Sequence, residues 1–310
     1  MKKLFYILAM SLSLAFTACD DDPVDGPSES ESLVDFPQGD HDYDKEFVAF
    51  KDKFGTMPLY KFTEVQFRWA FNSYIPYYAN PGDEAYVGKA WKLIYENGLK
   101  NWPEDFLKQM LPYQIMLADS IYSLTGTSAT GYTKVVRNSC YGYSHMAFGF
   151  ANKSIDEMTV EQKREAVGDV AYALVGYAVS KEKMTIPERF DTLFTRYRGY
   201  YTQSFATGTN WSYWGYNFAG TLDGSVEATN GYSVEHDFAL YVKYMTMMSE
   251  ESFKKKFLND SFDCGGVLDK DQNPVREHPV QNKYEAVRDF FKEKYGIDLS
   301  AIGAITEKME

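Results

Sequence analysis

Apolar residues recur at helical spacing through most of the chain after residue 40. This period predicts helices at residues 42–54, near 64–71, and at 83–98, 103–111, 159–179, 233–248 and 282–296, with a short one after Asp298. Residues 56–62, 112–124 and 141–152 have the composition of strands. Helices outnumber strands and no regular strand–helix alternation appears. The pattern therefore predicts an α+β fold, rich in helices, with a small mixed sheet.

The first residues form a targeting segment that does not belong to the fold. Lys2 and Lys3 precede an apolar run from Leu4 to Phe16, and a small-residue cleavage site ends in Cys19. The run is too short to span a bilayer as a stable helix. Residues 1–18 resemble a bacterial lipoprotein signal peptide, in which the cysteine becomes the acylated first residue of the mature chain. The alternative is an ordinary secretory signal followed by an incidental Cys19.

An acidic, Ser- and Pro-containing stretch follows at residues 19–40. It cannot bury enough apolar surface to fold, so we expect a flexible tether between the lipid on Cys19 and the folded part. The acids at 20–22 resemble an export signal that sends some lipoproteins to the outer face of the outer membrane. In other bacteria an Asp beside the cysteine retains the protein at the inner membrane. We expect a lipid-anchored protein of the outer membrane that faces the cell exterior.

Charge and length limit the kinds of partner and the number of domains that we expect. The formal net charge is −12, and removal of residues 1–18 takes away two lysines and no acid. A surface of this sign repels nucleic acid, so we predict no nucleic-acid partner. Residues 41–310 contain no second linker and no repeat, which predicts a single domain. Cys140 and Cys264 could pair in an oxidising compartment, but their spacing leaves this open.

Aromatic residues make up 17% of the chain, and their densest cluster lies at residues 210–218. Tyrosine and tryptophan provide rigid, amphipathic contact surface for sugars or peptides. The candidate ligand-binding residues are Trp211, Tyr213, Trp214 and Tyr216. The alternative for this cluster is packing in an aromatic-rich core strand.

Familiar catalytic and metal-binding motifs are missing from the sequence. None of the four histidines belongs to an HExxH motif, which would place two zinc ligands on one helical face. The segment 269–273 begins like a calcium loop, but Pro274 stands where that loop needs glycine. Residues 126–133 have the glycine spacing of a phosphate loop, with Tyr132 in place of its lysine. We therefore predict no metal ligand set and no cofactor.

Several segments together resemble a family, the substrate-import-associated zinc metallohydrolase lipoproteins, which are related to zinc-binding metallopeptidases. They are the lipoprotein start, KFGTMPLYKF, DFLKQMLPYQIMLADSIYSL, the helix at 163–179 followed by IPERF, EHDFALYVKYM and KYEAVRDFFKEKYGIDLSAI. The resemblance covers most of residues 35–302. It implies a zincin-like fold and a place beside outer-membrane importers of nutrients, often glycans.

The resemblance also locates a candidate site that departs from the family pattern. The family is expected to carry HExxH and zinc on the central helix, where this chain has Gly168-Asp169-Val170-Ala171-Tyr172. Gly168 cannot bind a metal, Tyr172 is a poor zinc ligand at neutral pH, and Asp169 is one methylene shorter than glutamate. In a later helix, His236 and Asp237 stand within a segment that has lost the family's flanking acids. The zinc ligands thus look lost.

Small residues on the central helix fit a role in packing. Glycine and alanine allow other elements to approach closely, and glycine lowers helix stability unless packing offsets the loss. The alternative is a rebuilt metal site that uses Asp169, His236 and Asp237. The small residues in question are Gly168, Ala171, Ala173, Gly176 and Ala178.

Three functional hypotheses follow. The first is a catalytically inactive lipoprotein that serves as a binding or accessory component of outer-membrane uptake of glycans or glycoproteins. The alternative is an active metallohydrolase or peptidase with a non-standard metal site. The third is a structural subunit docked on an importer. The sequence identifies no substrate and no oligomeric state.

Overall fold

The computed structural model describes residues 34–196, 220–222, 233–263, 265–268 and 274–310. All elements below belong to the unit Pro37–Glu310. The aromatic cluster at 210–218, Cys19 and Cys264 lie outside the described residues, so the predictions made for them stay predictions.

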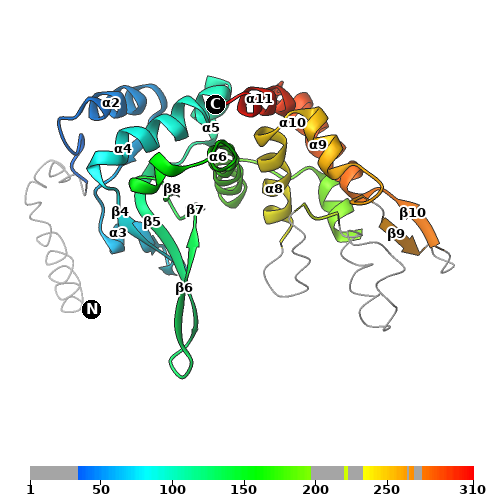
Figure 1. Cartoon of the computed structure of the whole chain (residues 1–310), viewed down its shortest axis with the longest axis horizontal. Coiled ribbons are helices and arrows are strands. Elements are labelled where there is room, and N and C mark those ends of the chain that lie inside the picture. Colours follow the sequence, from blue (N-terminus) through cyan, green and yellow to red (C-terminus); the bar gives the residue numbers. More distant parts are fainter. Residues whose placement is uncertain (1–33, 197–219, 223–232, 264, 269–273) are drawn as a thin grey trace, which may run out of the picture. The chain divides into compact units, whose positions relative to one another are not determined.

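A long strand, β5 (Gln114–Thr127), organises the main sheet (Figure 1). Its first half pairs in parallel with β1 (Met57–Leu59) and β8 (His145–Phe148), and β7 (Ser139–Tyr141) adds antiparallel to β8. Its second half pairs antiparallel with β4 (Tyr77–Pro81) and β6 (Gly131–Arg137). Two small hairpins stand apart, β2–β3 (Trp69–Ala70, Ser73–Tyr74) and β9–β10 (Gly265–Leu268, Pro274–Glu277).

Helices make up most of the rest of the described chain. They are α2 (Asp42–Phe54), α3 (Glu64–Arg68), α4 (Glu84–Trp91), α5 (Glu104–Met110), α6 (Val160–Ser180), α8 (Val234–Met247), α9 (Glu250–Phe257), α10 (Pro279–Tyr295) and α11 (Leu299–Glu307). The π-helix η1 (Lys92–Glu96) continues α4, the 3-10 turns η2 (Leu99–Asn101) and η3 (Lys153–Glu157) are short, and residues 188–196 are helical. The structure is thus α+β with a mixed sheet, as the sequence predicts.

Most predicted helices are confirmed, and their ends follow local chemistry. Thr159 caps α6 by accepting a hydrogen bond from the Gln162 N–H, and the Gln162 side chain accepts in return from the Thr159 N–H. Gly55 ends α2 in the left-handed conformation (φ 74°). The predicted helix near 64–71 is shorter than expected, because the backbone turns into β2 at Trp69.

Helix α6 is buried along most of its length and packs against β7, β8 and α8. Its small residues make this possible, as the sequence predicts. A Cβ added to Gly176 would lie 2.5 Å from Cε1 of Tyr141 on β7, well inside van der Waals contact. Close packing at this position therefore requires glycine.

His145 begins β8 in the core and is 1% exposed, next to the ring of Phe67 at a centroid distance of 5.1 Å. Its Nε2 has no hydrogen-bond partner among the described residues. Burial, with a smaller contribution from Lys181, lowers the pKa of this imidazole to about 4. His145 is thus a neutral core residue at neutral pH.

This burial predicts a sensitivity to acid. Between the two pKa values the unfolded chain binds a proton that the folded chain does not, so stability falls as pH drops below the unfolded value of about 6.5. His145 alone should cost about 2 kcal/mol between about pH 7.5 and about pH 5. The His145→Phe variant should show a correspondingly shallower fall, measured by urea unfolding at several pH values. Identical pH slopes for the two proteins would contradict the expectation.

Candidate functional site

The candidate site lies where α6 and α8 pack against each other. Asp169 and Tyr172 of the predicted site belong to α6, and His236 and Asp237 belong to α8. Asp169 of α6 contacts Lys243 of α8, and Tyr172, one turn later on α6, contacts His236, two turns earlier on α8. The two helices therefore run antiparallel. At Gly168 they come so close that an added Cβ would lie 3.1 Å from Cγ of Lys243 and 3.2 Å from Sδ of Met247.

Asp169 is a buried carboxylate whose two oxygens both accept hydrogen bonds. Lys243 Nζ donates to Oδ1 at 2.6 Å, and the Asn138 amide, between β6 and β7, donates to Oδ2 at 2.9 Å. The side chains of Asp169 and Lys243 are 9% and 11% exposed, so this ion pair is largely desolvated. Glu165, one turn earlier on α6, lies 3.4 Å from the same ammonium.

The electrostatics of the pair follow from burial and proximity. Burial raises the pKa of Asp169, and the Lys243 ammonium and the Asn138 amide oppose that rise. Burial would lower the pKa of Lys243, but the Asp169 carboxylate outweighs it, so that the pKa of Lys243 is raised. Each charge thus makes the burial of the other tolerable.

Tyr172 and His236 form a second pair at the same crossing. The Tyr172 hydroxyl lies 2.7 Å from His236 Nδ1, and the two rings meet edge to face at 5.7 Å. Burial raises the pKa of the Tyr172 phenol, with a smaller contribution from Tyr141, so the phenol is neutral at neutral pH. A neutral phenol hydrogen-bonded to the imidazole is a poor substitute for a histidine zinc ligand.

Asp237 faces away from this crossing. It is fully buried and accepts a hydrogen bond at 2.6 Å from Lys283 Nζ of α10, and both side chains are at most 1% exposed. The structure therefore joins Tyr172 to His236 but does not bring Asp169 and Asp237 together. Each of the two acids has its own lysine.

These residues do not fit a zinc ion. Zinc in proteins takes three or four histidine, cysteine or carboxylate ligands that converge on one point. Here an ammonium lies 2.6 Å from each acid, and Asp169 has both oxygens occupied by N–H donors. Within the part of the chain that the structure describes, no three such side chains form a group that could hold a metal.

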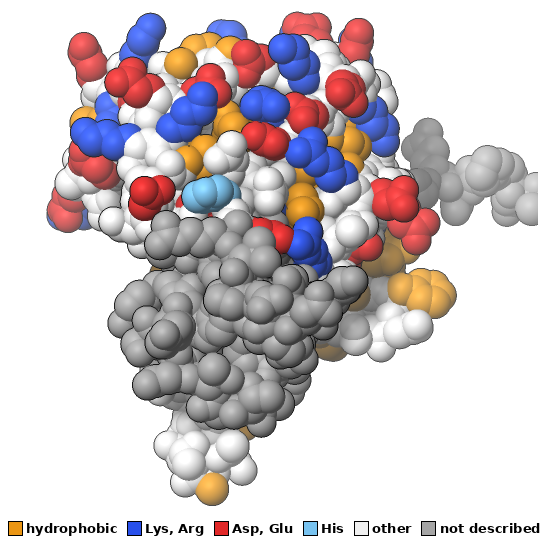
Figure 2. All heavy atoms as spheres, turned by 90° about the vertical axis from the view of Figure 1, so that its right-hand side faces the viewer, with side chains coloured by type: hydrophobic (Ala, Val, Ile, Leu, Met, Phe, Trp, Pro, Cys, Tyr) orange, Lys and Arg blue, Asp and Glu red, His pale blue; other side chains and the backbone are white. Residues whose placement is uncertain are grey.

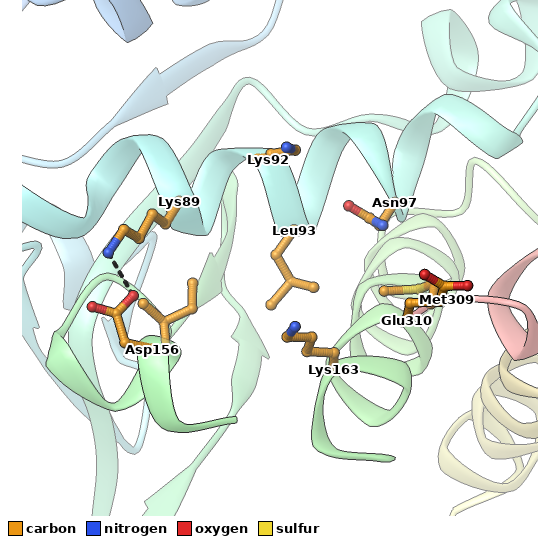
Figure 3. Close-up of a pocket in the computed structure, with 9 residues that line it drawn as sticks. Lys89, Lys92, Leu93, Asn97, Asp156, Lys163, Met309 and Glu310 are labelled. Carbon is orange, nitrogen blue, oxygen red and sulfur yellow. Dashed lines mark hydrogen bonds and ion pairs between the residues drawn. The ribbon is translucent and has the colours of Figure 1, made fainter. Parts of the chain in front are cut away.

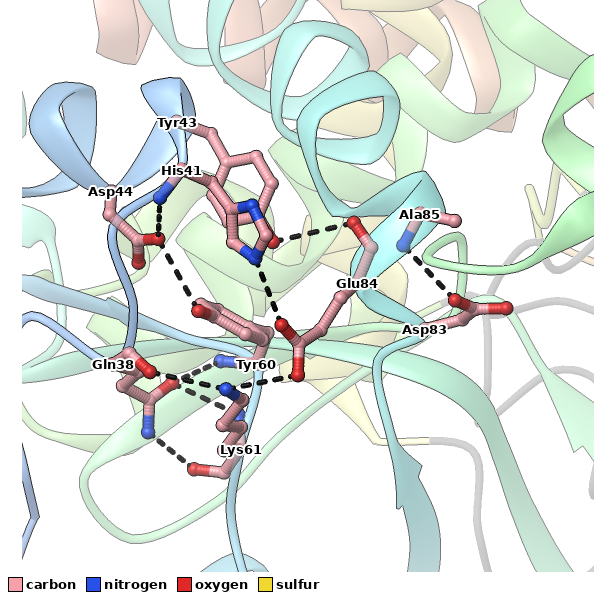
Figure 4. A network of polar contacts seen from close by, with 9 residues as sticks. All are labelled: Gln38, His41, Tyr43, Asp44, Tyr60, Lys61, Asp83, Glu84 and Ala85. Carbon is pink, nitrogen blue, oxygen red and sulfur yellow. Dashed lines mark hydrogen bonds and ion pairs between the residues drawn. The ribbon is translucent and has the colours of Figure 1, made fainter.

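A polar network near the start of the folded unit contains a histidine and three acids, but it holds elements together (Figure 4). Gln38 Oε1 accepts hydrogen bonds from the backbone N–H groups of Tyr60 and Lys61 at 2.7 and 2.9 Å. Glu84 binds His41 Nε2 and Lys61 Nζ, each at 2.9 Å. The contacts tie the segment before α2 to α4 and to the two residues that follow β1, which is a structural role.

A cavity of about 470 Å³ opens between η1, η3 and the chain end (Figure 3). Lys89, Lys92 and Lys163 line it together with Leu93 and Ile155, among others. Asp156 forms an ion pair with Lys89 at 2.5 Å, and Glu310 is a second acidic residue in the cavity lining. The charges nearly cancel, so the cavity does not select clearly for an anion or a cation.

Lys243, Lys283 and Asn138 are the residues of the site that sequence reasoning missed. Lys243 follows His236 by seven residues, which places both on one face of α8. That spacing could have predicted a cation two turns from His236. It could not have predicted its partner, because Asp169 is 74 residues away in the chain.

The comparisons with known proteins are sparse. No protein-family model matches the chain, and no curated protein sequence does. A crystal structure from Bacteroides caccae, described as a "putative zinc-binding metallo-peptidase", is similar with a TM-score of 0.47 and 12% identity over 87% of this chain and 94% of that one. The similarity is too low to transfer a zinc site to this chain.

No helix among the described residues has the length and hydropathy needed to cross a membrane.

Cys140 is buried in β7, and burial raises the pKa of its thiol. A buried thiol of this kind is a weak nucleophile at neutral pH.

Removing one or both partners of the Asp169–Lys243 pair tests its contribution to the free energy of unfolding. Lys243→Met leaves a buried carboxylate without its cation and should lower the free energy of unfolding by about 3 kcal/mol. Adding Asp169→Leu should recover at least about half of that loss, measured by urea unfolding.

The matched control for this cycle is Lys254→Met on α9. Lys254 pairs with Glu250 at 2.7 Å at the surface, with side chains 54% and 42% exposed. Its loss should cost less than about 1 kcal/mol. Equal losses for Lys243→Met and Lys254→Met would show that the buried pair has no special structural role.

Proposed function

We propose that this chain is a catalytically inactive relative of zinc metallohydrolases that acts as a lipid-anchored binding or accessory component of nutrient uptake at the outer membrane. The observation that carries the proposal is the ion pair between Asp169 and Lys243. The resemblance of the sequence to import-associated metallohydrolase lipoproteins supplies the zincin-like scaffold and the biological setting.

The ion pair argues against hydrolysis at the position where the family has its general base. A general base must accept a proton from a water molecule through an available oxygen lone pair. In Asp169 both oxygens already accept from Lys243 and Asn138, and the side chain is 9% exposed. Proton transfer to Asp169 would neutralise the carboxylate and leave the largely buried Lys243 ammonium without its counter-charge, which is unfavourable.

The membrane part of the proposal rests on the sequence before residue 41. A lipid on Cys19 would anchor the chain, and the acidic tether would hold the folded unit away from the membrane surface. The proposed partners are the membrane itself and importer proteins of the outer membrane.

The charge distribution supports the exclusion of nucleic acid as a partner. Figure 2 shows acidic and basic side chains interspersed over the described part of the face turned to the viewer. A nucleic-acid site would gather lysine and arginine in a patch or stripe. The formal net charge of −12 works in the same direction.

The proposed ligand is a glycan or a peptide, bound by the aromatic residues of the segment 210–218. Aromatic faces stack on the apolar faces of sugars, and tyrosine and tryptophan also offer hydrogen bonds. The residues are Trp211, Tyr213, Trp214 and Tyr216.

A binding assay with matched tryptophan variants tests this function. The mature chain, with Cys19→Ser to keep it soluble, is applied to an array of plant, mucin and bacterial glycans. We expect binding to a defined set of glycans, at least tenfold weaker in the Trp211→Ala, Trp214→Ala double variant. The control is Trp69→Ala, because this tryptophan is 46% exposed on the β2–β3 hairpin.

Two results would contradict the proposal. One is glycan binding that the double variant keeps in full while the protein stays folded by circular dichroism. The other is cleavage of a bound glycan or glycopeptide that is lost in Asp169→Ala, which would favour the alternative of an active metallohydrolase.

A further inference from the structure

The hairpin formed by the second half of β5 and by β6 projects from the folded unit (Figure 1). All seven residues of β6 are exposed. Its turn is well defined, because the side chains and backbone of Thr127 and Thr130 hydrogen-bond to each other at 3.0 to 3.2 Å. Gly126 and Gly131 flank the turn at φ 117° and 79°, which few other residues adopt.

One face of the hairpin carries most of its exposed apolar side chains. The register pairs Tyr122 with Val136 and Leu124 with Lys134, and side chains two apart on a strand share a face. On this face Leu124 is 39%, Tyr132 63% and Val136 71% exposed. The opposite face carries Ser123, Thr125, Thr127 and Thr133, with Val135, 36% exposed, as its one exposed large apolar side chain. The tip, residues 126–132, contains no charged residue, and none is seen on the part of it at the bottom of Figure 2.

The apolar face continues into an ordered stack on the neighbouring strand. Lys134 Nζ lies 4.2 Å from the ring centre of Tyr122, and Tyr122 stacks on Tyr78 of β4 at 5.5 Å with an interplanar angle of 10°. The Arg68 guanidinium covers the same Tyr78 ring at 3.8 Å. These contacts hold the side chains in place before any partner binds, which lowers the entropy lost on binding.

Beyond its pairing with β5, β6 has no strand partner among the described residues. Proteins usually protect such an edge with proline, a bulge or a covering loop. β6 contains no proline, and its charged residues are Lys134, between Tyr132 and Val136, and Arg137 at its end; no covering strand is present among the described residues. Its outward backbone N–H and C=O groups are therefore suited to receive another strand.

The charge of the hairpin indicates the kind of strand that would fit. Residues 120–137 contain Lys134 and Arg137 and no acid, within a chain whose formal net charge is −12. Acidic side chains on a partner would find complementary charge here and repulsion over much of the remaining surface.

We propose that β6 and the apolar face of the hairpin bind an extended, acidic segment of a partner protein by strand addition. Backbone hydrogen bonds along β6 would provide affinity, and alternate side chains would lie against Tyr132, Lys134 and Val136. A carbohydrate would use the rings and cations but not the row of backbone groups, so a polypeptide is the better match. The proposal does not depend on the loss of zinc chemistry between α6 and α8.

A peptide selection tests this surface directly. The mature chain with Cys19→Ser is immobilised and used to select from a phage-displayed library of random dodecapeptides. We expect selected peptides in which apolar residues alternate with Asp or Glu. A synthetic selected peptide should slow amide hydrogen exchange at residues 131–137 in the full mature chain by at least about tenfold.

Matched variants show whether the selected peptide binds at the hairpin. Lys134→Glu should weaken the selected peptide about fivefold, whereas Lys153→Glu, an exposed lysine on η3, should not. Val136→Thr should also weaken it, with Val65→Thr as the control because Val65 is 59% exposed. All four residues are exposed, so each variant is expected to fold.

Three outcomes would overturn the proposal. The first is that no peptide is selected, and the second is that the selected peptides bind Lys134→Glu as well as the wild type. The third is that a sulfated oligosaccharide, and no peptide, binds in a manner that Lys134→Glu abolishes. None of these depends on the tryptophan variants, so the outcome is separate from that of the glycan assay.

Discussion

Helices α6 and α8 approach each other at Gly168, where a side chain of any size would meet Lys243 and Met247. The close approach places the Lys243 ammonium 2.6 Å from the Asp169 carboxylate and largely excludes water from both. A desolvated charge is stable in the folded state only with a partner of opposite sign. The charge of Asp169 is thereby committed to holding two helices together. The interface between α6 and α8 thus passes through the position at which the sequence resemblance predicts a zinc site.

Strand β5 is central to the main sheet, and it also extends beyond the buried part of the protein. The first half of β5 is buried between β1 and β8, and its second half pairs with β6 in a hairpin exposed to solvent. Exposed apolar side chains are tolerated singly on a protein surface, but a contiguous group on a projecting edge usually has a binding role. The hairpin thus provides an exposed surface next to the buried part of the same strand.

The sequence predicts elements better than it predicts their partners. Capping residues and period make α2 and α6 recognisable, because Gly55 and the Thr159–Gln162 pair act within a few residues of the helix ends. β6 was not predicted. Both of its faces are exposed, so its sequence lacks the regular alternation of apolar and polar residues that indicates a half-buried strand. For the site, the structure brings Tyr172 and His236, two members of the predicted candidate site, into contact. Lys243 could not be assigned to Asp169, since that pairing depends on the tertiary crossing.

The central claim is that Asp169 belongs to a structural ion pair and not to a zinc site, and metal content tests it most directly. The mature chain is purified without chelator or metal-affinity resin, and zinc per chain is determined by elemental analysis. The Asp169–Lys243 pair predicts a negligible amount of zinc and a thermal midpoint that a chelator does not change. Close to one zinc per chain, removed by chelator with a fall in the thermal midpoint, would contradict the account.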